Sequence, residues 1–404
     1  MGDEPEPVGS HESIPDSTGP IRRAIEDRGE YLDAVEAIRA GEGPVAIDAE
    51  RASGFRYSQR AYLIQVFRRG AGSFLFDPPA IGGDLHELGD ANGDEWIIHA
   101  ASQDLTCLRE VGIHPTTLFD TELAARLLGM DRVGLGPVVE ELLGIHLAKA
   151  HSAVDWSTRP LRDEWLEYAA LDVELLVDVR DILVQRLDEA GKSEFAAQEF
   201  AATLTRDFNP PRSDPWRKMS DLHTVRGQRG LAVARELWIA RDEWAQETDI
   251  APGRLVPDKS LAAAARTLPA SKRDLAEMKD FNGRASRSQI DRWWAAIERG
   301  RTTEELPPIR VPGDALPPIR AWADRNPAAA ARIGLARDAI AELAEEFAIP
   351  VENLLTPEYL RRVAWAPPEP ATPEAIGEAL KALGARPWQI ALTSQRISDS
   401  FSAA

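Results

Sequence analysis

Short apolar runs alternate with amphipathic segments over the first half of the chain. The pattern predicts strands over 44–50, 61–67, 72–77 and 95–100, and helices over 21–40, 102–111, 120–128, 135–143 and 162–187. The first three strands follow one another through polar connections, which favours an antiparallel meander. Because the later strand signal alternates with helices, we expect an α/β sandwich around a mixed central sheet.

The second half of the chain is predicted to be entirely helical and is divided by proline-rich breaks. We expect a disordered acidic tail at 1–20, an α/β domain at 21–205, a linker at 206–215, a helical domain at 216–300, a second linker at 301–318 and a last helical domain at 319–404.

The composition is that of an ordinary globular protein. Of 404 residues, 44% are hydrophobic and 28% are charged, and no apolar run approaches the ~18 residues of a transmembrane helix. The N-terminus lacks the basic start and apolar stretch of a signal peptide. The single cysteine, Cys107, excludes an internal disulfide. We therefore expect a cytoplasmic protein that does not bind a membrane.

The net charge of −19 argues at first against a nucleic-acid partner. The distribution of charge weakens that argument, because residues 216–300 hold 16 Lys or Arg against 12 Asp or Glu, a local balance of +4. Such a segment can contact phosphates, and part of the negative charge can belong to a cation site. Bulk charge therefore does not decide the question.

Two acids close the first predicted strand. Asp48 and Glu50 are two residues apart in PVAIDAE, so both side chains leave the same face of the sheet. Burying a carboxylate alone is costly, and a divalent cation such as Mg²⁺ or Mn²⁺ is the natural compensation. Taken alone, the pair is better explained by a strand that ends at Ala49 and two solvated acids.

Three further residues are just as ambiguous when taken singly. Asp104 falls in the first turn of a predicted helix, where Asp is common because it interacts favourably with the helix dipole. Tyr168 and Asp172 are four apart in WLEYAALDVELL, so they share one helical face. The alternative without a function for that pair is an exposed acid beside a half-buried tyrosine.

The order of these five residues resembles the tyrosine branch of the DEDD superfamily of 3′→5′ exonucleases, and specifically the ribonuclease D family. VAIDAE is similar to the first exonuclease motif, IIHAASQDL to the second and DWSTRPLRDEWLEYAALDVELL to the third. Position 167 is Glu where the histidine branch carries His, and Tyr168 stands where the tyrosine branch has its Tyr. Residues 216–300 resemble an HRDC domain, and the last segment is similar to a second, degenerate one.

This resemblance implies a ribonuclease H-like exonuclease domain followed by all-α HRDC-type domains. It implies hydrolysis of RNA from the 3′ end to nucleoside 5′-monophosphates, with two divalent cations, Mg²⁺ or Mn²⁺, held by Asp48, Glu50, Asp104 and Asp172. Asp48 would bridge the cations, and Tyr168 would orient the attacking water. The expected partner is the single-stranded 3′ end of RNA, tRNA precursors included, and no nucleotide cofactor is expected.

Weaker hypotheses concern contacts to RNA. Gln65 could shape the pocket for the terminal nucleotide, although a role in sheet packing is at least equally compatible. Other candidates flank the third motif or lie in the HRDC-like segment: Lys149, Trp156, Arg226, Arg229, Arg284 and Arg287. For the charged residues among them, simple solvation is the alternative.

Two other functions remain open at the level of sequence. A 3′→5′ DNA exonuclease of the same superfamily would carry the same acids, because the choice of RNA depends on contacts to the 2′-hydroxyl. A non-enzymatic RNA-binding adaptor would be expected to have lost at least one of the five residues, and none is lost.

Overall fold

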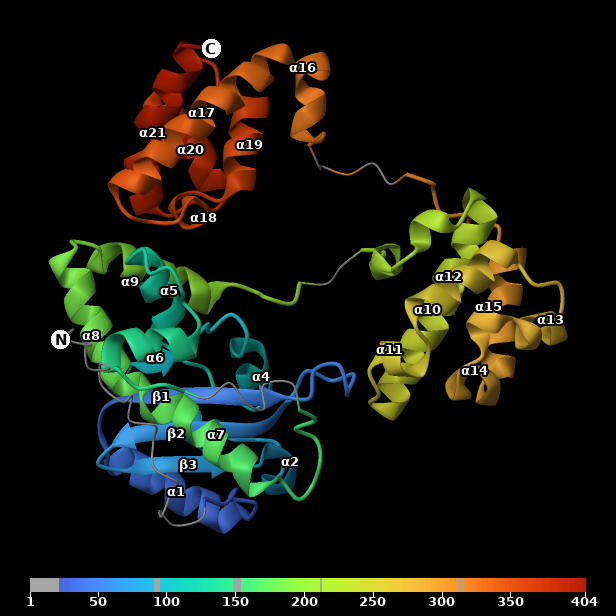
Figure 1. The fold of residues 1–404 in the computed structure, drawn as a ribbon, viewed down its shortest axis with the longest axis horizontal. Helices are drawn as coiled ribbons and strands as arrows, with labels where there is room; N and C mark the ends of the chain where they lie inside the picture. Colours follow the sequence, from blue (N-terminus) through green and yellow to red (C-terminus); the bar gives the residue numbers. More distant parts are fainter. Residues whose placement is uncertain (1–21, 91–94, 148–153, 211–212, 311–312, 314–315) are drawn as a thin grey trace, which may run out of the picture.

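A five-stranded mixed sheet organises the N-terminal part of the molecule (Figure 1). The structure, a computed structural model, describes residues 22–90, 95–147, 154–210, 213–310, 313 and 316–404. The sheet has the order β3-β2-β1-β4-β5. Its strands are β1 (Glu42–Arg51), β2 (Ala61–Arg69), β3 (Gly72–Phe76), β4 (Trp96–Ile98) and β5 (Leu118–Asp120).

Strand pairing confirms the predicted meander. β1, β2 and β3 pair antiparallel, whereas β4 lies parallel to both β1 and β5. The predicted α/β fold around a mixed sheet is therefore confirmed. The helices of this part are α1 (Arg28–Ala40), α2 (Pro78–Ile81), α3 (His86–Asp90), α4 (Leu105–Glu110), α5 (Thr121–Leu127), α6 (Leu135–Leu143), α7 (Asp163–Glu174), α8 (Leu176–Glu189) and α9 (Ser193–Thr205).

The alternation of side chains along β1 separates a core face from a site face. Ile47 and Ala49 belong to the large apolar core that also contains Tyr31 of α1. Asp48 and Glu50 leave the opposite face, the side on which α7 packs against β1, β2 and β3 (Figure 1). The core face thus fixes the strand, and the site face is free to carry acids.

Two predicted helices differ from the structure, and one strand was not predicted. The first helix begins at Arg28 rather than residue 21, because the Asp27 side chain caps it and Ile25 pairs with Phe76 instead. The helix predicted over 162–187 is interrupted at Leu175 and forms α7 and α8. The strand β5 was not predicted, since its three residues are too short for a periodic signal.

The last helices form a C-terminal module that shares its core with the sheet domain. One cluster of buried apolar side chains runs from α1 to the final helix. Trp388 stacks on Phe195 of α9 with ring centroids 4.6 Å apart, and its indole N–H donates to Glu199 at 2.9 Å. The helices of this module are α16 (Trp322–Arg325), α17 (Pro327–Glu346), α18 (Val351–Leu354), α19 (Pro357–Trp365), α20 (Pro373–Ala382) and α21 (Pro387–Ser402).

The helices between the two linkers form a middle module with a separate core. Trp293 and Phe281 are fully buried at its centre, with their rings edge to face. The module comprises α10 (Gly227–Thr248), α11 (Pro252–Leu255), α12 (Asp258–Thr267), α13 (Lys272–Glu277), α14 (Arg284–Ser288) and α15 (Ile290–Thr302). Its core and the core of the sheet domain are distinct clusters.

The middle module contacts the sheet domain through the β1–β2 loop, residues 52–60. Asp249, at the end of α10, accepts hydrogen bonds from the Ser58 amide at 2.9 Å and the Tyr62 hydroxyl at 3.1 Å. The Arg254 guanidinium lies 4.0 Å from the centroid of the Phe55 ring. The module is thus fastened to the segment that continues the strand carrying Asp48 and Glu50.

The tail predicted at 1–20 lies outside the described residues. Within the described ranges, no helix is both long enough and apolar enough to cross a membrane.

Replacing Asp249 by Ala is expected to loosen the β1–β2 loop, because the Ser58 amide and the Tyr62 hydroxyl lose their shared acceptor. A hydrogen bond to a charged group is worth about 1.5–3 kcal/mol, so amide exchange in the loop should accelerate by about tenfold or more. Hydrogen–deuterium exchange measures this. Glu247→Ala is the control, since Glu247 pairs with Arg292 inside the module. Unchanged exchange over residues 52–60 in Asp249→Ala would contradict the docking role.

Candidate active site

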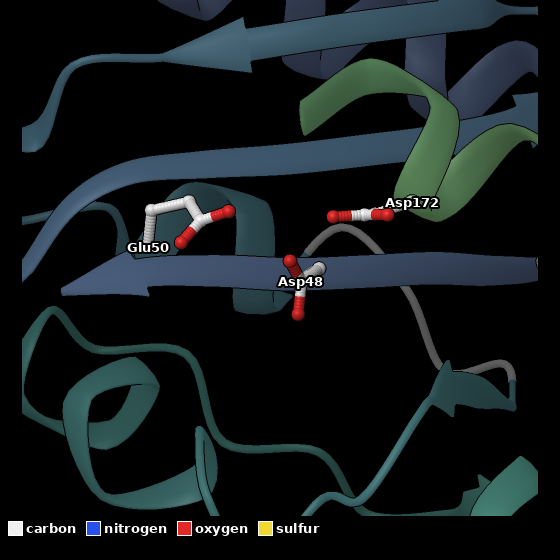
Figure 2. Close-up of side chains that lie close together, drawn as sticks. All are labelled: Asp48, Glu50 and Asp172. Atoms are coloured by element: carbon white, nitrogen blue, oxygen red, sulfur yellow. The ribbon is translucent and has the colours of Figure 1, made fainter. Parts of the chain in front are cut away.

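Three of the predicted acids meet beside the central strand. Asp48 and Glu50 extend from β1, and Asp172 extends from α7 toward them (Figure 2). One carboxylate oxygen from each lies within 4.8 Å of the other two. The two-residue repeat of the strand places Asp48 and Glu50 on the same face of β1. The packing of α7 on that face then brings Asp172 close to them.

Asp104 reaches the same site from the segment after β4, the strand that neighbours β1 on the edge away from β2. It is the N-cap residue of α4, one position before the first turn in which it was predicted, and its side chain makes no capping hydrogen bond. Its carboxylate instead lies 3.6 Å from Arg51, which follows Glu50 at the end of β1. Asp104 and the three clustered acids line one cavity of about 590 Å³.

Tyr168 lies one helical turn before Asp172 and lines the same cavity. Its hydroxyl hydrogen-bonds Asp172, which fixes the ring relative to the carboxylates. Burial, and then the negative charge of Asp172, raises the pKa of the Tyr168 phenol, so it keeps its proton at neutral pH. The five residues predicted from the sequence therefore face one cavity.

Desolvation raises the pKa of every acid in this group. For Glu50 the pKa rises well above the ordinary value through desolvation and then through repulsion from Asp48 and Asp172. For Asp104 the causes are desolvation and then the charge of Asp48. Desolvation also raises the pKa of Asp48, and that of Asp172 to about 8. In metal-free protein the group therefore holds protons that cations would displace.

The donor set fits hard divalent cations. The site offers carboxylate oxygens, which Mg²⁺ and Mn²⁺ prefer, and neither the cluster nor Asp104 contributes nitrogen or sulfur. Mutual repulsion of desolvated carboxylates is the condition that bound cations relieve. His99 also lines the cavity, but its ring bonds Thr121 at 2.9 Å and burial lowers its pKa to about 4. Cys107 is a buried free thiol.

Asp120 supports the site without lining the cavity, and the sequence analysis missed it. Its carboxylate accepts hydrogen bonds from the amides of Ala100 and Ala101 at 3.1 and 2.9 Å, and from two amides at the start of α5. The turn that leads to Asp104 is thereby held against β5. The spacing of Asp120 and Glu122 at a helix start was the available signal.

Two of the predicted RNA contacts, Gln65 and Trp156, are fully buried in this structure and stay predictions. Gln65 lies beside Asp48 in the strand register, on the face covered by α7, and neither of its amide atoms meets a partner among the described residues. This burial favours the alternative that Gln65 packs within the sheet. Trp156 packs against Trp165 with ring centroids 5.6 Å apart, in a core beneath α7.

The basic residues predicted to contact RNA differ in their positions. Arg229 is partly buried and donates to the carbonyls of Gly300 and Thr303, so it secures the end of α15. Arg226, Arg284 and Arg287 are exposed on the middle module and stay predictions. Lys149 lies outside the described residues.

The fold and the carboxylate cluster define a nuclease. Residues 23–188 match the family profile described as 3′-5′ exonuclease, residues 230–297 match the HRDC domain, and residues 315–401 match the 3′ to 5′ exonuclease C-terminal domain. The ribonuclease D of Gluconacetobacter diazotrophicus is 31% identical over 84% of this chain and 85% of its own length. That of Granulibacter bethesdensis is 32% identical over 73% and 74%. The chain belongs to the ribonuclease D family and is a 3′→5′ exoribonuclease.

Solved structures agree with this family. The crystal structure of a protein from Bifidobacterium adolescentis is similar with a TM-score of 0.86 and 36% identity, covering 95% of this chain and 97% of that one. Escherichia coli RNase D, an exoribonuclease involved in structured RNA processing, gives a TM-score of 0.66 and 28% identity, with coverage of 89% and 98%. The predicted resemblances to an exonuclease and, for the middle segment, to an HRDC domain are confirmed. The second HRDC-like domain expected at the end of the chain stays a prediction, and residues 315–401 match the exonuclease C-terminal domain instead.

The metal-free protein is expected to lose stability as pH rises from about 4 to 8. In this window folded Asp172, with a pKa of about 8, binds a proton that the unfolded chain, with an ordinary value of 3.8, does not bind. The stabilisation is complete below about pH 4 and is lost as pH rises through 8. Mn²⁺ should reverse the loss, because cations replace the protons.

Thermal unfolding from pH 5 to 9, in EDTA and in Mn²⁺, measures this effect. Asp172→Asn is the matched variant, since it removes one of the titrating carboxylates and should reduce the pH dependence in EDTA. A metal-free wild type with the same pH dependence as Asp172→Asn would refute the assignment.

Proposed function

We propose that this exoribonuclease removes nucleotides one at a time from the single-stranded 3′ end of RNA and uses two divalent cations, Mg²⁺ or Mn²⁺. The carrying observation is the meeting of Asp48, Glu50 and Asp172 within 4.8 Å, with Asp104 on the same cavity. Four carboxylates are suited to two divalent ions, because the charges then balance. The products are nucleoside 5′-monophosphates.

Each residue has a role that follows from its position. When bound, the cations would neutralise the scissile phosphate and activate water. By the family resemblance, Asp48 would share its carboxylate between both cations, Glu50 and Asp172 would complete one ligand set, and Asp104 would hold the other. Tyr168 keeps its proton and can hydrogen-bond the attacking water, which orients it toward phosphorus.

Membership of the ribonuclease D family favours RNA over DNA as the substrate. The description of one relative favours structured RNA. Escherichia coli RNase D is described as acting in structured RNA processing. We extend this to tRNA precursors, whose 3′ tails are single-stranded extensions of a folded body. The intact acids and Tyr168 argue against a non-catalytic adaptor.

The wild-type protein is expected to shorten a 5′-labelled single-stranded RNA by single nucleotides in Mg²⁺ or Mn²⁺, and to be inactive in EDTA. A matching DNA should be cut more slowly, and a tRNA precursor should lose its 3′ tail. Asp48→Ala should abolish turnover without lowering the melting temperature of metal-free protein, because it removes a repelling carboxylate.

The matched control for this assay is Asp178→Ala. Asp178 is an exposed acid of α8 that pairs with Arg69, away from the cavity, and its removal should leave turnover intact. Faster cleavage of DNA than of RNA would favour a DNA exonuclease, and RNA binding without any cleavage would favour the adaptor. Near-normal turnover by Asp48→Ala would refute the site.

Tyr168→Phe is expected to lower kcat by about 10²-fold and to change KM little, because the water loses its orienting hydroxyl while the ligand set stays complete. Steady-state kinetics on the same RNA measure the split, and Mn²⁺ titration by calorimetry should show unchanged metal binding. Tyr359→Phe, which alters a half-buried tyrosine of the C-terminal module, is the control. A loss of Mn²⁺ binding in Tyr168→Phe would speak against the orienting role.

A further inference from the structure

Arg51 is a cation inside the acidic cavity to which the proposed mechanism gives no role. It is the last residue of β1, directly after Glu50, and it lines the same cavity as the four acids. Its guanidinium nitrogen lies 3.6 Å from the Asp104 carboxylate, and its side chain is 25% exposed against 7% for Asp104. The arginine therefore reaches inward to a carboxylate yet remains accessible from the cavity.

The contact between Arg51 and Asp104 is loose. A distance of 3.6 Å exceeds that of a hydrogen bond, so no fixed geometry ties the guanidinium to this acid. Arg159, by contrast, is held firmly: it donates to Asp77 at 2.5 Å and to the Tyr62 carbonyl at 2.9 Å. The looser contact leaves the Arg51 guanidinium free to exchange its partner.

Arg51 is also the sole permanent positive charge among the described residues that line the cavity. The other basic side chain on this lining, His99, is neutral at physiological pH because burial lowers its pKa to about 4. Among the residues that the structure describes, an anion that enters the cavity would therefore find the Arg51 guanidinium as its positive partner, beside any bound cations.

With two divalent cations bound, the site would carry a net positive charge, which is that of Arg51. Two divalent cations balance four carboxylates, and the guanidinium then adds one positive charge. A phosphodiester carries one negative charge. In addition, a cation ligated by Asp104 would repel the guanidinium that occupies that carboxylate in the metal-free protein. With cations bound, Arg51 would thus be free of Asp104 and would retain a positive charge for an anion.

We propose that Arg51 is a phosphate clamp: once cations are bound, its guanidinium turns from Asp104 to the non-bridging oxygens of the scissile phosphate, and then to the 5′-phosphate of the released nucleotide. A planar guanidinium can hold two phosphate oxygens at once, which fixes the orientation of the phosphate as well as its affinity. The inference rests on the proposed function, because it assigns the phosphate of that reaction.

The test uses adenosine 5′-monophosphate, a product that cannot be hydrolysed further by this reaction. Calorimetry measures its dissociation constant with the full-length protein in saturating Mn²⁺ and in EDTA. Arg51→Gln should weaken binding in Mn²⁺ by about tenfold or more, since a charge-assisted bidentate contact is lost. The difference from wild type should shrink in EDTA, where Arg51 is engaged by Asp104.

Two further variants separate the clamp from simpler roles. Arg51→Lys keeps the charge but not the fork of donors, so we expect a loss of about threefold or more. Arg186→Gln removes a surface arginine that pairs with Glu141 outside the cavity, and should bind the nucleotide like wild type. Mn²⁺ binding by Arg51→Gln should be as tight as in wild type or tighter, because a competing cation is removed.

Several results would overturn the proposal. Nucleotide affinity within twofold of wild type in Arg51→Gln, or in Arg51→Lys if Arg51→Gln does not fold, removes the clamp. An equal loss of Mn²⁺ and nucleotide binding in Arg51→Gln would instead make Arg51 a residue that only positions Asp104. Absence of RNA cleavage by the wild type would fail the proposed function, whereas these binding results with an active wild type fail the clamp alone.

Discussion

Repulsion among desolvated carboxylates is the constraint on which the rest of this structure depends. Asp48, Glu50 and Asp172 are held close together although the charge of Asp48 raises the pKa of both other acids and the charge of Asp172 raises that of Glu50. Such a group persists only if the surrounding fold fixes the backbone that carries it. The apolar core on one face of β1 and the packing of α7 on the other supply that rigidity, so the acids are in place before any cation arrives.

Residues governed by local periodicity could be predicted from the sequence. The alternation along β1 places Asp48 and Glu50 on one face, and the helical repeat places Tyr168 and Asp172 together. Their joining into one cavity depends on strand order and helix packing, which no local pattern encodes. For Asp104 the order of residues along the chain was the guide, since its position as an N-cap gave no sign of a shared cavity.

The features that the sequence did not reveal depend on contacts between distant parts of the chain. Gln65 and Trp156 carry polar or aromatic groups suited to a nucleotide, yet the face that α7 covers buries both. Burial of this kind is decided by elements far apart in the chain. Arg51 escaped notice because an arginine at a strand end looks solvated, whereas here the strand end opens into the cavity.

The β1–β2 loop ties two parts of the molecule that look separable. Phe55 and Ser58 meet the middle module only a few residues after Glu50, so the docking surface and the catalytic motif share one stretch of backbone. The module is therefore not an interchangeable appendage. A displacement of its docking edge would therefore be transmitted along a few residues of backbone to the acids themselves.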